Sequence, residues 1–299
     1  MVVKTHLTGS RINIKSFSLA RSKKQAESLS LNLAANVFRR LVIAAICIAI
    51  TLFLLLMIMP IISLLQFSGT SRIWQSITQF DGMAAISLSL YTTAVTAAFT
   101  FFIGTPAAFL LSRFRKLRAV KALSVVCQLP IALPPSIAGI ALLLFFGKNG
   151  IGGHMLTALG LNIVFTPVAV MIAQFFVSCP LYVQSLRISA NAVPEELFEA
   201  AYVNGADAIT TIVRFIIPML RPAIVSAIIV SYIRSLGEFG ATLLFAGNMT
   251  GATSTMLPHI YTLMQSDVRL SAAFSLILIS IAAVMVVALK GLLGREDNA

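Results

Sequence analysis

The sequence predicts an all-α polytopic membrane protein with about six transmembrane helices. Apolar residues make up 58% of the 299 positions and charged residues only 11%, whereas a soluble domain carries about 25% charged residues. The apolar residues form long continuous runs, which favour spanning helices over buried strands. The period-two alternation of a membrane barrel is absent from the sequence.

Six apolar runs are each long enough to cross a bilayer. They are Leu41–Leu65, Met83–Leu111, Ala119–Phe146, Val164–Leu186, Phe215–Ala246 and Leu270–Leu289. The sequence therefore predicts a transmembrane domain over residues 41–290. It is flanked by a tail at 1–40 and a short tail at 291–299.

The first tail is serine-rich and basic, and Glu27 is its one acidic residue. We expect a disordered cytoplasmic tail that keeps the start of the first helix on the positive side of the membrane. An organelle transit peptide has a similar composition, and the sequence leaves that alternative open.

Basic residues other than Arg234 divide eighteen to three between the two sides. The eighteen lie in the two tails, in the loop "SRFRKLRAVK" and around the loop 187–214. The three are Arg72, Lys148 and Arg269. Because cytoplasmic loops carry an excess of Lys and Arg, we expect both termini and both basic loops in the cytoplasm, in an inner or plasma membrane. The net charge of +12 follows mostly from this topology, and no nucleic-acid partner is indicated.

Two of the predicted spans carry residues that are unusual at membrane depth. In the third, Pro134 and Pro135 remove backbone donors and predict a bend, which is tolerated where the freed carbonyls are buried or line a cavity. The bend either borders a translocation pathway or only shapes the scaffold.

The fifth span carries the intramembrane charges Arg234 and Glu238, one helical turn apart. Unpaired charges in lipid are costly, so we expect an ion pair facing the bundle. The pair either holds the helix in register or lies at the gate of the pathway, where Arg234 would meet an anion. Ser231 and Ser235 add hydroxyl donors, and the glycines 237 and 240 permit close packing or a local break.

The loop 187–214 is rich in acidic residues, holding four of the chain's ten. Pro194 suits a first helical turn, and Gly205 interrupts the helical pattern. An apolar face is expected from the spacing of Leu197, Phe198, Ala201 and Tyr202. The sequence predicts a short helix, a turn and a second short helix, which offer a compact surface to a protein partner.

Several chemistries have no motif in the sequence. The Walker A pattern that binds ATP is absent, and no nucleophile lies in a catalytic pattern with a base. The three cysteines and three histidines are scattered, which predicts neither a disulfide framework nor a zinc site. We therefore expect no enzyme activity in this chain alone, no cofactor and no metal.

Glu199, Ala200 and Ala201 are followed after three residues by Gly205, and then by Pro218. This spacing resembles the EAA loop of ABC importer permeases, which reads E-A-A, three residues, G, nine residues and I-x-L-P. Phe215 and Ile217 replace the usual isoleucine and leucine, and both changes are apolar.

The resemblance implies a type I ABC importer permease fold. It also implies that the protein works as a homodimer in the lipid bilayer. The segment 195–214 would be a coupling helix that docks on a separate ATPase subunit. An extracytoplasmic oxyanion-binding protein would deliver the substrate, and ATP hydrolysis in the partner would drive transport.

Three further stretches resemble the molybdate permeases within that family. They are "QLPIALPPSIAGIALLLFFGKNGIGG" (128–153), "SYIRSLGEFGATLLFAGN" (231–248) and "LPHIYTLMQ" (257–265). The resemblance implies molybdate, and tungstate with it, as the substrate. A sulfate/thiosulfate permease is the alternative. A stand-alone secondary transporter would need its own coupling acid, for which Glu238 is the clear candidate.

Overall fold

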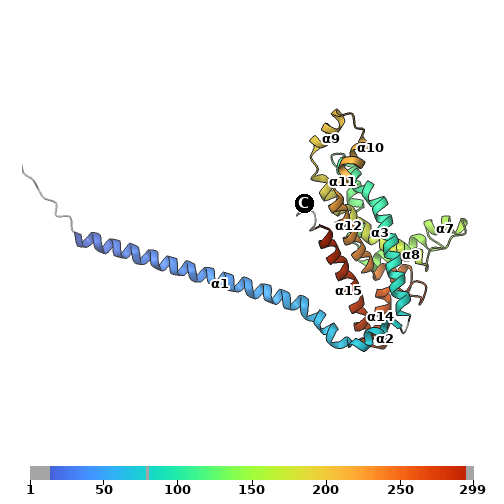
Figure 1. Ribbon diagram of the computed structural model, residues 1–299, viewed down its shortest axis with the longest axis horizontal. Coiled ribbons are helices and arrows are strands. Elements are labelled where there is room, and N and C mark those ends of the chain that lie inside the picture. The colour runs from blue at the N-terminus through green and yellow to red at the C-terminus, as the bar shows by residue number, and fades with distance from the viewer. Residues whose placement is uncertain (1–13, 79–80, 294–299) are drawn as a thin grey trace, which may run out of the picture. The chain divides into compact units, whose positions relative to one another are not determined.

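The structure is a computed structural model that describes residues 14–78 and 81–293, and the regular elements of these residues are all helices (Figure 1). The chain divides into two compact units, Met1–Ser63 and Leu64–Ala299. Each unit is described by itself.

The first unit holds most of α1 (Ile14–Ser68), whose stretch Phe38–Ser68 is long and apolar enough to cross a membrane. Sequence reasoning predicted disorder over residues 1–40, but the helix already begins at Ile14. The segment before the apolar run is rich in Lys, Ala and Leu, which favour helix, and helix propagates readily from a formed neighbour. Residues 1–13 lie outside the described part of the chain.

The centre of the second unit is formed by α3 (Gly82–Arg113), α8 (Pro167–Asn191) and α12 (Arg221–Leu236), which pack against one another. α15 (Val268–Leu293) packs against α12. The second, fourth and sixth predicted spans are therefore present as α3, α8 and α15.

Polar side chains hold α3 against α8 inside this bundle. Gln174 is buried and its amide bridges two hydroxyls of α3: it donates to Thr93 Oγ1 at 3.3 Å and accepts from Thr96 Oγ1 at 3.1 Å. One end of the same interface is fixed by a 2.6 Å hydrogen bond between Thr105 Oγ1 and Tyr182 Oη. Hydrogen bonds of this kind between polar side chains join spanning helices to one another.

The third and fifth predicted spans are bent, not continuous. α4 (Arg118–Val126) and α5 (Leu129–Ala132) meet α6 (Pro135–Phe146) at 112°. Residues 209–219 meet α12 at 72°. α12 then stops at Leu236, and a separate α13 (Gly240–Phe245) follows. Counting each bent pair as one span gives up to six spans in the described residues, and otherwise four.

Most of the remaining helices of the second unit are short and lie at its ends. α9 (Glu195–Val203), α10 (Ala208–Thr211), the π-helix η1 (Ile212–Ile216) and α11 (Ile217–Met219) connect α8 to α12. Figure 1 shows α9 and α10 at one end of the bundle. α2 (Thr70–Thr78) and α14 (Met256–Ser266) lie at the other end. α7 (Ile151–Ala158) follows α6.

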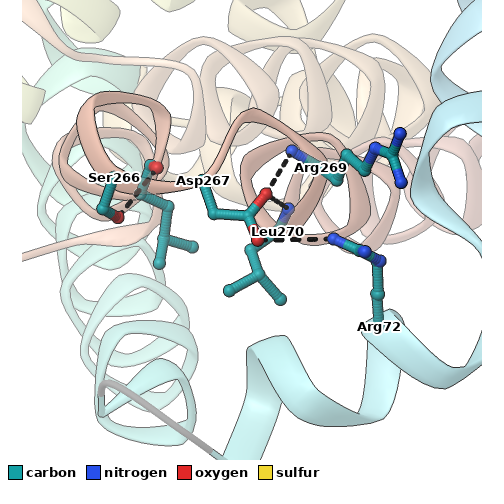
Figure 2. A network of polar contacts seen from close by, with 6 residues as sticks. Arg72, Ser266, Asp267, Arg269 and Leu270 are labelled. Atoms are coloured by element: carbon teal, nitrogen blue, oxygen red, sulfur yellow. Dashed lines mark hydrogen bonds and ion pairs between the residues drawn. The ribbon is translucent and has the colours of Figure 1, made fainter.

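The end that carries α2 is fixed by the carboxylate of Asp267, which lies between α14 and α15 (Figure 2). Asp267 Oδ1 accepts from the backbone N–H groups of Arg269 at 2.8 Å and Leu270 at 3.3 Å, so it caps the start of α15. Asp267 Oδ2 accepts from Arg72 Nη1 at 3.3 Å. One side chain thus ties α2 to the first turn of α15.

Candidate functional site

The segment from α9 to α11 contains the residues expected to couple the chain to an ATPase. Glu195 and Glu196 occupy the first turn of α9, where carboxylates interact favourably with the helix dipole. Leu197 and Phe198 are partly buried and pack on the core formed by α3, α8 and α12. This inner face anchors the short helix, since nine residues alone form a helix only marginally in water.

The outer side of the same segment is apolar and exposed. Tyr202 is 80% exposed, Val203 83% and Ile209 72%. The helical spacing placed Tyr202 on one face with Leu197 and Phe198, and in the structure Tyr202 lines the same cavity as Phe198 but stays 80% exposed. The helix therefore presents an apolar surface to the surroundings of the chain in addition to the one it buries.

Gly205 lies at the turn after α9 with a φ of +82°. A Cβ added there would meet nothing within 4 Å. The backbone conformation, and not a lack of space, is therefore what favours glycine at this position. The turn is closed by hydrogen bonds from the N–H groups of Gly205 and Ala206 to the carbonyls of Tyr202 and Ala201.

α10 begins beside Asp207, whose Oδ1 accepts from the N–H of Thr210 at 3.0 Å. Hydrogen bonds from the side chain and backbone of Thr210 lower the pKa of the Asp207 carboxyl below its ordinary value. Because the folded pKa is depressed, the charged cap is fully present above the ordinary titration range and is lost only as pH falls through the lowered pKa.

The other residues of the E-A-A…G…P pattern occupy different positions in this segment. Glu199 and Ala200 are exposed on α9, while Ala201 is partly buried. Pro218 lies in α11, directly after η1 and before the bend into α12. The π-helix was not predicted, and no feature of the sequence identifies it.

The basic loop after α3 lies beside α9. Lys116 Nζ is 3.5 Å from Glu195 Oε1, and the Arg113 guanidinium lies over the Phe198 ring at 4.9 Å. The two loops predicted to share one side of the membrane are therefore neighbours.

The expected intramembrane ion pair is present at the end of α12. Arg234 Nη1 lies 2.9 Å from Glu238 Oε2, and the two side chains are 31% and 1% exposed. Glu238 lies two residues beyond the end of α12, and its Oε1 accepts from the N–H of Ala241 in the first turn of α13 at 2.9 Å. Glu238 therefore also caps α13, a role that sequence reasoning missed because a continuous helix was expected there.

The two helix breaks meet at this point. A Cβ on Gly240 would lie 3.0 Å from Pro135 Cβ and from the N of Ser136. One added to Gly139 would lie 2.8 Å from Ala241 Cα. α6 and α13 therefore approach each other through glycine, and they bring the break at Pro134–Pro135 beside the break at 237–239.

The hydroxyls expected near the pair face the interior of the bundle. Ser231 Oγ donates to the carbonyl of Ser178 on α8 at 3.4 Å. Ser235 Oγ and Thr242 Oγ1 are buried and have no hydrogen-bond partner among the described residues. The proline side of the junction differs, since Pro134 and Pro135 are exposed.

Residues 101–294 match the family described as "binding-protein-dependent transport system inner membrane component". The chain belongs to this family. The permease is therefore a multi-pass membrane protein, and this family assignment agrees with the E-A-A…G…P pattern in the segment from α9 to α11.

Three named relatives align with most of the permease. It is 46% identical over 262 residues to the probable transport system permease protein NifC of Clostridium pasteurianum, covering 87% of this chain and 91% of that one. It is 38% identical over 228 residues to the molybdenum transport system permease protein ModB of Mycobacterium tuberculosis, covering 76% and 86%. The sulfate transport system permease protein CysT of Escherichia coli is 28% identical over 247 residues, covering 82% and 89%.

A solved structure gives independent support for the fold. The permease resembles a chain from a bacterial ABC transporter involved in the import of the acidic polysaccharide alginate, with a TM-score of 0.70 and 18% identity. The match covers 88% of this chain and 99% of that chain. The predicted ABC importer permease fold is confirmed.

Proposed function

We propose that the permease moves molybdate, and tungstate with it, through the membrane as the transmembrane subunit of an ABC importer. The observation that carries the proposal is the likeness to the molybdenum transport permease over 76% of this chain. Family membership also favours an importer served by a binding protein over a stand-alone secondary transporter.

The junction of the two helix breaks suits the passage of an anion. The first N–H groups of α6 have no intrahelical partner, and discontinuous membrane helices present such ends to anionic substrates. Arg234 supplies a positive charge at the neighbouring break, and 31% of its side chain is exposed. We propose that Arg234, Glu238, Ser231, Ser235, Pro134 and Pro135 border the pathway. Weak contacts of this kind suit conduction, because a site that held the oxyanion tightly would trap it.

The segment from α9 to α11, called the coupling segment below, connects transport to ATP hydrolysis in the partner. The exposed apolar residues of α9 and α10 form a surface for a separate ATPase subunit, with Glu199, Ala200, Ala201, Gly205 and Pro218 as the coupling residues. ATP binding closes the ATPase pair and displaces α9, and the displacement reaches α12 through η1 and α11. The translocation pathway then turns from inward-facing to outward-facing.

The remaining partners follow from the same proposal. The permease forms a homodimer in the inner membrane with both termini in the cytoplasm, and an extracytoplasmic oxyanion-binding protein delivers substrate to its outer face. The segregation of basic residues to the α9 end of the bundle supports this orientation.

The substrate is tested by competition among molybdate, tungstate, sulfate and thiosulfate for the cognate binding protein, followed by uptake in proteoliposomes that hold the whole complex. We expect molybdate and tungstate to bind and enter in preference to the sulfur oxyanions. The resemblance to the sulfate permease CysT makes sulfate the second candidate. Tighter binding and faster uptake of sulfate than of molybdate would overturn the molybdate proposal.

A further inference from the structure

A cavity of about 1000 Å³ lies beneath the coupling helix. It is enclosed by the last turns of α3, the end of α8, α9 and the π-helix η1. The pathway residues at the junction of α6 and α13 do not line it, whereas Glu199, Tyr202 and Val203 of the coupling helix do.

The mouth of the cavity carries positive charge. Arg113, Arg115 and Lys116 line it together with Glu195 and Glu199. Lys116 is paired with Glu195 at 3.5 Å, which leaves two guanidinium groups facing one carboxylate. Arg115 has no ion-pair partner among the described residues, and its side chain is exposed.

The interior of the cavity is apolar and runs along a membrane-spanning helix. From Arg113 the lining passes Leu110 and Phe109 to reach Thr105. Eight residues of α-helix rise about 12 Å, which is the length of several methylene groups of an acyl chain. Leu110 is 46% exposed, so this part of the lining is not covered by the chain itself.

We propose that the cavity binds one anionic phospholipid. The phosphate headgroup lies between Arg113 and Arg115, and an acyl chain lies along Phe109 and Leu110. Basic pockets at the membrane face of spanning helices are suited to anionic headgroups. A lipid explains both halves of the lining, since a free oxyanion would leave the apolar wall uncovered. The bound lipid would touch Phe198 on α9, so it would stabilise the coupling helix from below.

The chain offers a direct optical test because Trp74 is its single tryptophan. In a Trp74→Phe background, Leu110→Trp places the fluorophore in the cavity, and Phe102→Trp places it at a 72% exposed position of α3 outside the cavity. Each variant is reconstituted, once alone and once with its ATPase, in bilayers that hold brominated phosphatidylglycerol or brominated phosphatidylcholine.

We expect phosphatidylglycerol to quench the Leu110→Trp signal at lower mole fraction than phosphatidylcholine, by about fivefold for each basic residue that contributes. The Phe102→Trp signal should show no such preference. Adding Arg115→Gln should reduce the preference at the cavity, and the matched change Arg118→Gln in the same loop should preserve it. Arg118 is exposed and does not line the cavity.

Three results would overturn the lipid site. They are equal quenching of Leu110→Trp by both lipids, a preference that Arg115→Gln leaves undiminished, and a preference that is present in the permease alone but absent when the ATPase is bound. The last result would make the ATPase the occupant of the cavity. Transport is not the readout, so failure of this proposal leaves the proposed function untouched, and the reverse also holds.

Discussion

At the scale of single residues, the proposed coupling role can be tested at Gly205. The proposed pathway can be tested at the Arg234–Glu238 pair. Gly205 has a φ of +82° and open space around it, so the backbone conformation requires glycine here and the packing does not. In the ion pair, the two partners differ in burial and in the number of groups that hold them.

Gly205→Val should uncouple transport. A left-handed conformation costs an L-residue about 1–2 kcal/mol, and a β-branched side chain makes it worse. We expect uptake to fall while the permease still inserts, and Gly205→Asn to retain more activity because asparagine tolerates this region. Uptake and retention of the ATPase subunit are the measurements.

Gly160 provides the control for Gly205, because its φ is +72° and a Cβ there would also meet nothing within 4 Å. Gly160→Val carries the same backbone strain outside the coupling segment, so it should leave the ATPase bound. Normal uptake together with normal ATPase retention in Gly205→Val would remove the coupling assignment.

The double variant Arg234→Met/Glu238→Gln separates a pathway role of the ion pair from a structural one. Removing one partner of a buried pair costs about 3–5 kcal/mol of stability. A single variant could therefore lose uptake because the protein is destabilised, whatever the role of the pair in the pathway. The double variant removes both charges and keeps an acceptor for the N–H of Ala241. We expect near-normal thermal stability and uptake reduced about tenfold or more, the effect of losing a charge-assisted contact of about 1.5–3 kcal/mol. Unchanged uptake would show that the pair only holds the fold.

At the scale of helices, the sequence predicted the straight spans well and the bent ones poorly. Long apolar runs identified α3, α8 and α15, because length and hydropathy alone decide such elements. Pro134 and Pro135 did signal a bend in the third span. Hydropathy cannot report a change of direction, however, so the 112° angle and the separate α13 appear only in the structure.

Side-chain roles at helix ends were less predictable still. At i,i+4 spacing, Glu238 pairs with Arg234 whether the helix continues or stops, so the sequence revealed the pair and not the cap on α13. Gln174 was missed because a single amide in an apolar run has no pattern. Its two partners on α3 lie about eighty positions earlier in the chain.

Gly139→Ala should separate α6 from α13. The new Cβ would lie 2.8 Å from Ala241 Cα and 2.9 Å from its carbonyl oxygen, and backbone atoms cannot yield as a flexible side chain does. We expect a loss of about 1–3 kcal/mol of stability, read as a lower thermal midpoint in detergent. Gly291→Ala is the matched control, since a Cβ there meets nothing within 4 Å. It should be neutral or slightly stabilising, and equal midpoints for both variants would contradict the close contact.

Deletion of Val213 tests whether the π-helix transmits motion. A π-turn holds one residue more than the α-helix it interrupts, and Val213 is 55% exposed within it. Deleting one residue should replace the wide π-turn by α-helical hydrogen bonds and so change the connection between α9 and α12. We expect an inserted permease that has lost uptake, while Val213→Ala, which keeps the length, transports normally. Uptake by the deletion variant would show that register in η1 is unimportant.

At the scale of the whole molecule, the proposed pathway is open on the side of the proline break. Ile137 is 51% exposed, Ile140 46% and Leu133 36%. Contiguous exposed apolar residues mark contact with a partner or with lipid. In the proposed homodimer a second copy covers this face and completes the wall of the pathway.

Cysteine cross-linking tests this face in a background without Cys47, Cys127 and Cys179. Ile137→Cys should form a disulfide-linked dimer in membranes, because a residue of this face that lies near the two-fold axis meets its own equivalent in the second copy. Phe102→Cys, which is 72% exposed on α3, should remain a monomer under the same oxidation. Cross-linking at residue 102 and none at residue 137, in a complex that still transports, would place the dimer contact elsewhere.

The turn at Gly205 also has a consequence for chirality. Its φ of +82° lies where an L-residue is strained and its mirror image is relaxed, and nothing lies within 4 Å of an added Cβ. A permease assembled by protein ligation with D-alanine at residue 205 should therefore couple as well as the native chain, while L-alanine at the same place should couple less. Side-chain volume is identical in the two proteins, so any difference in uptake between them would measure the handedness of this turn alone.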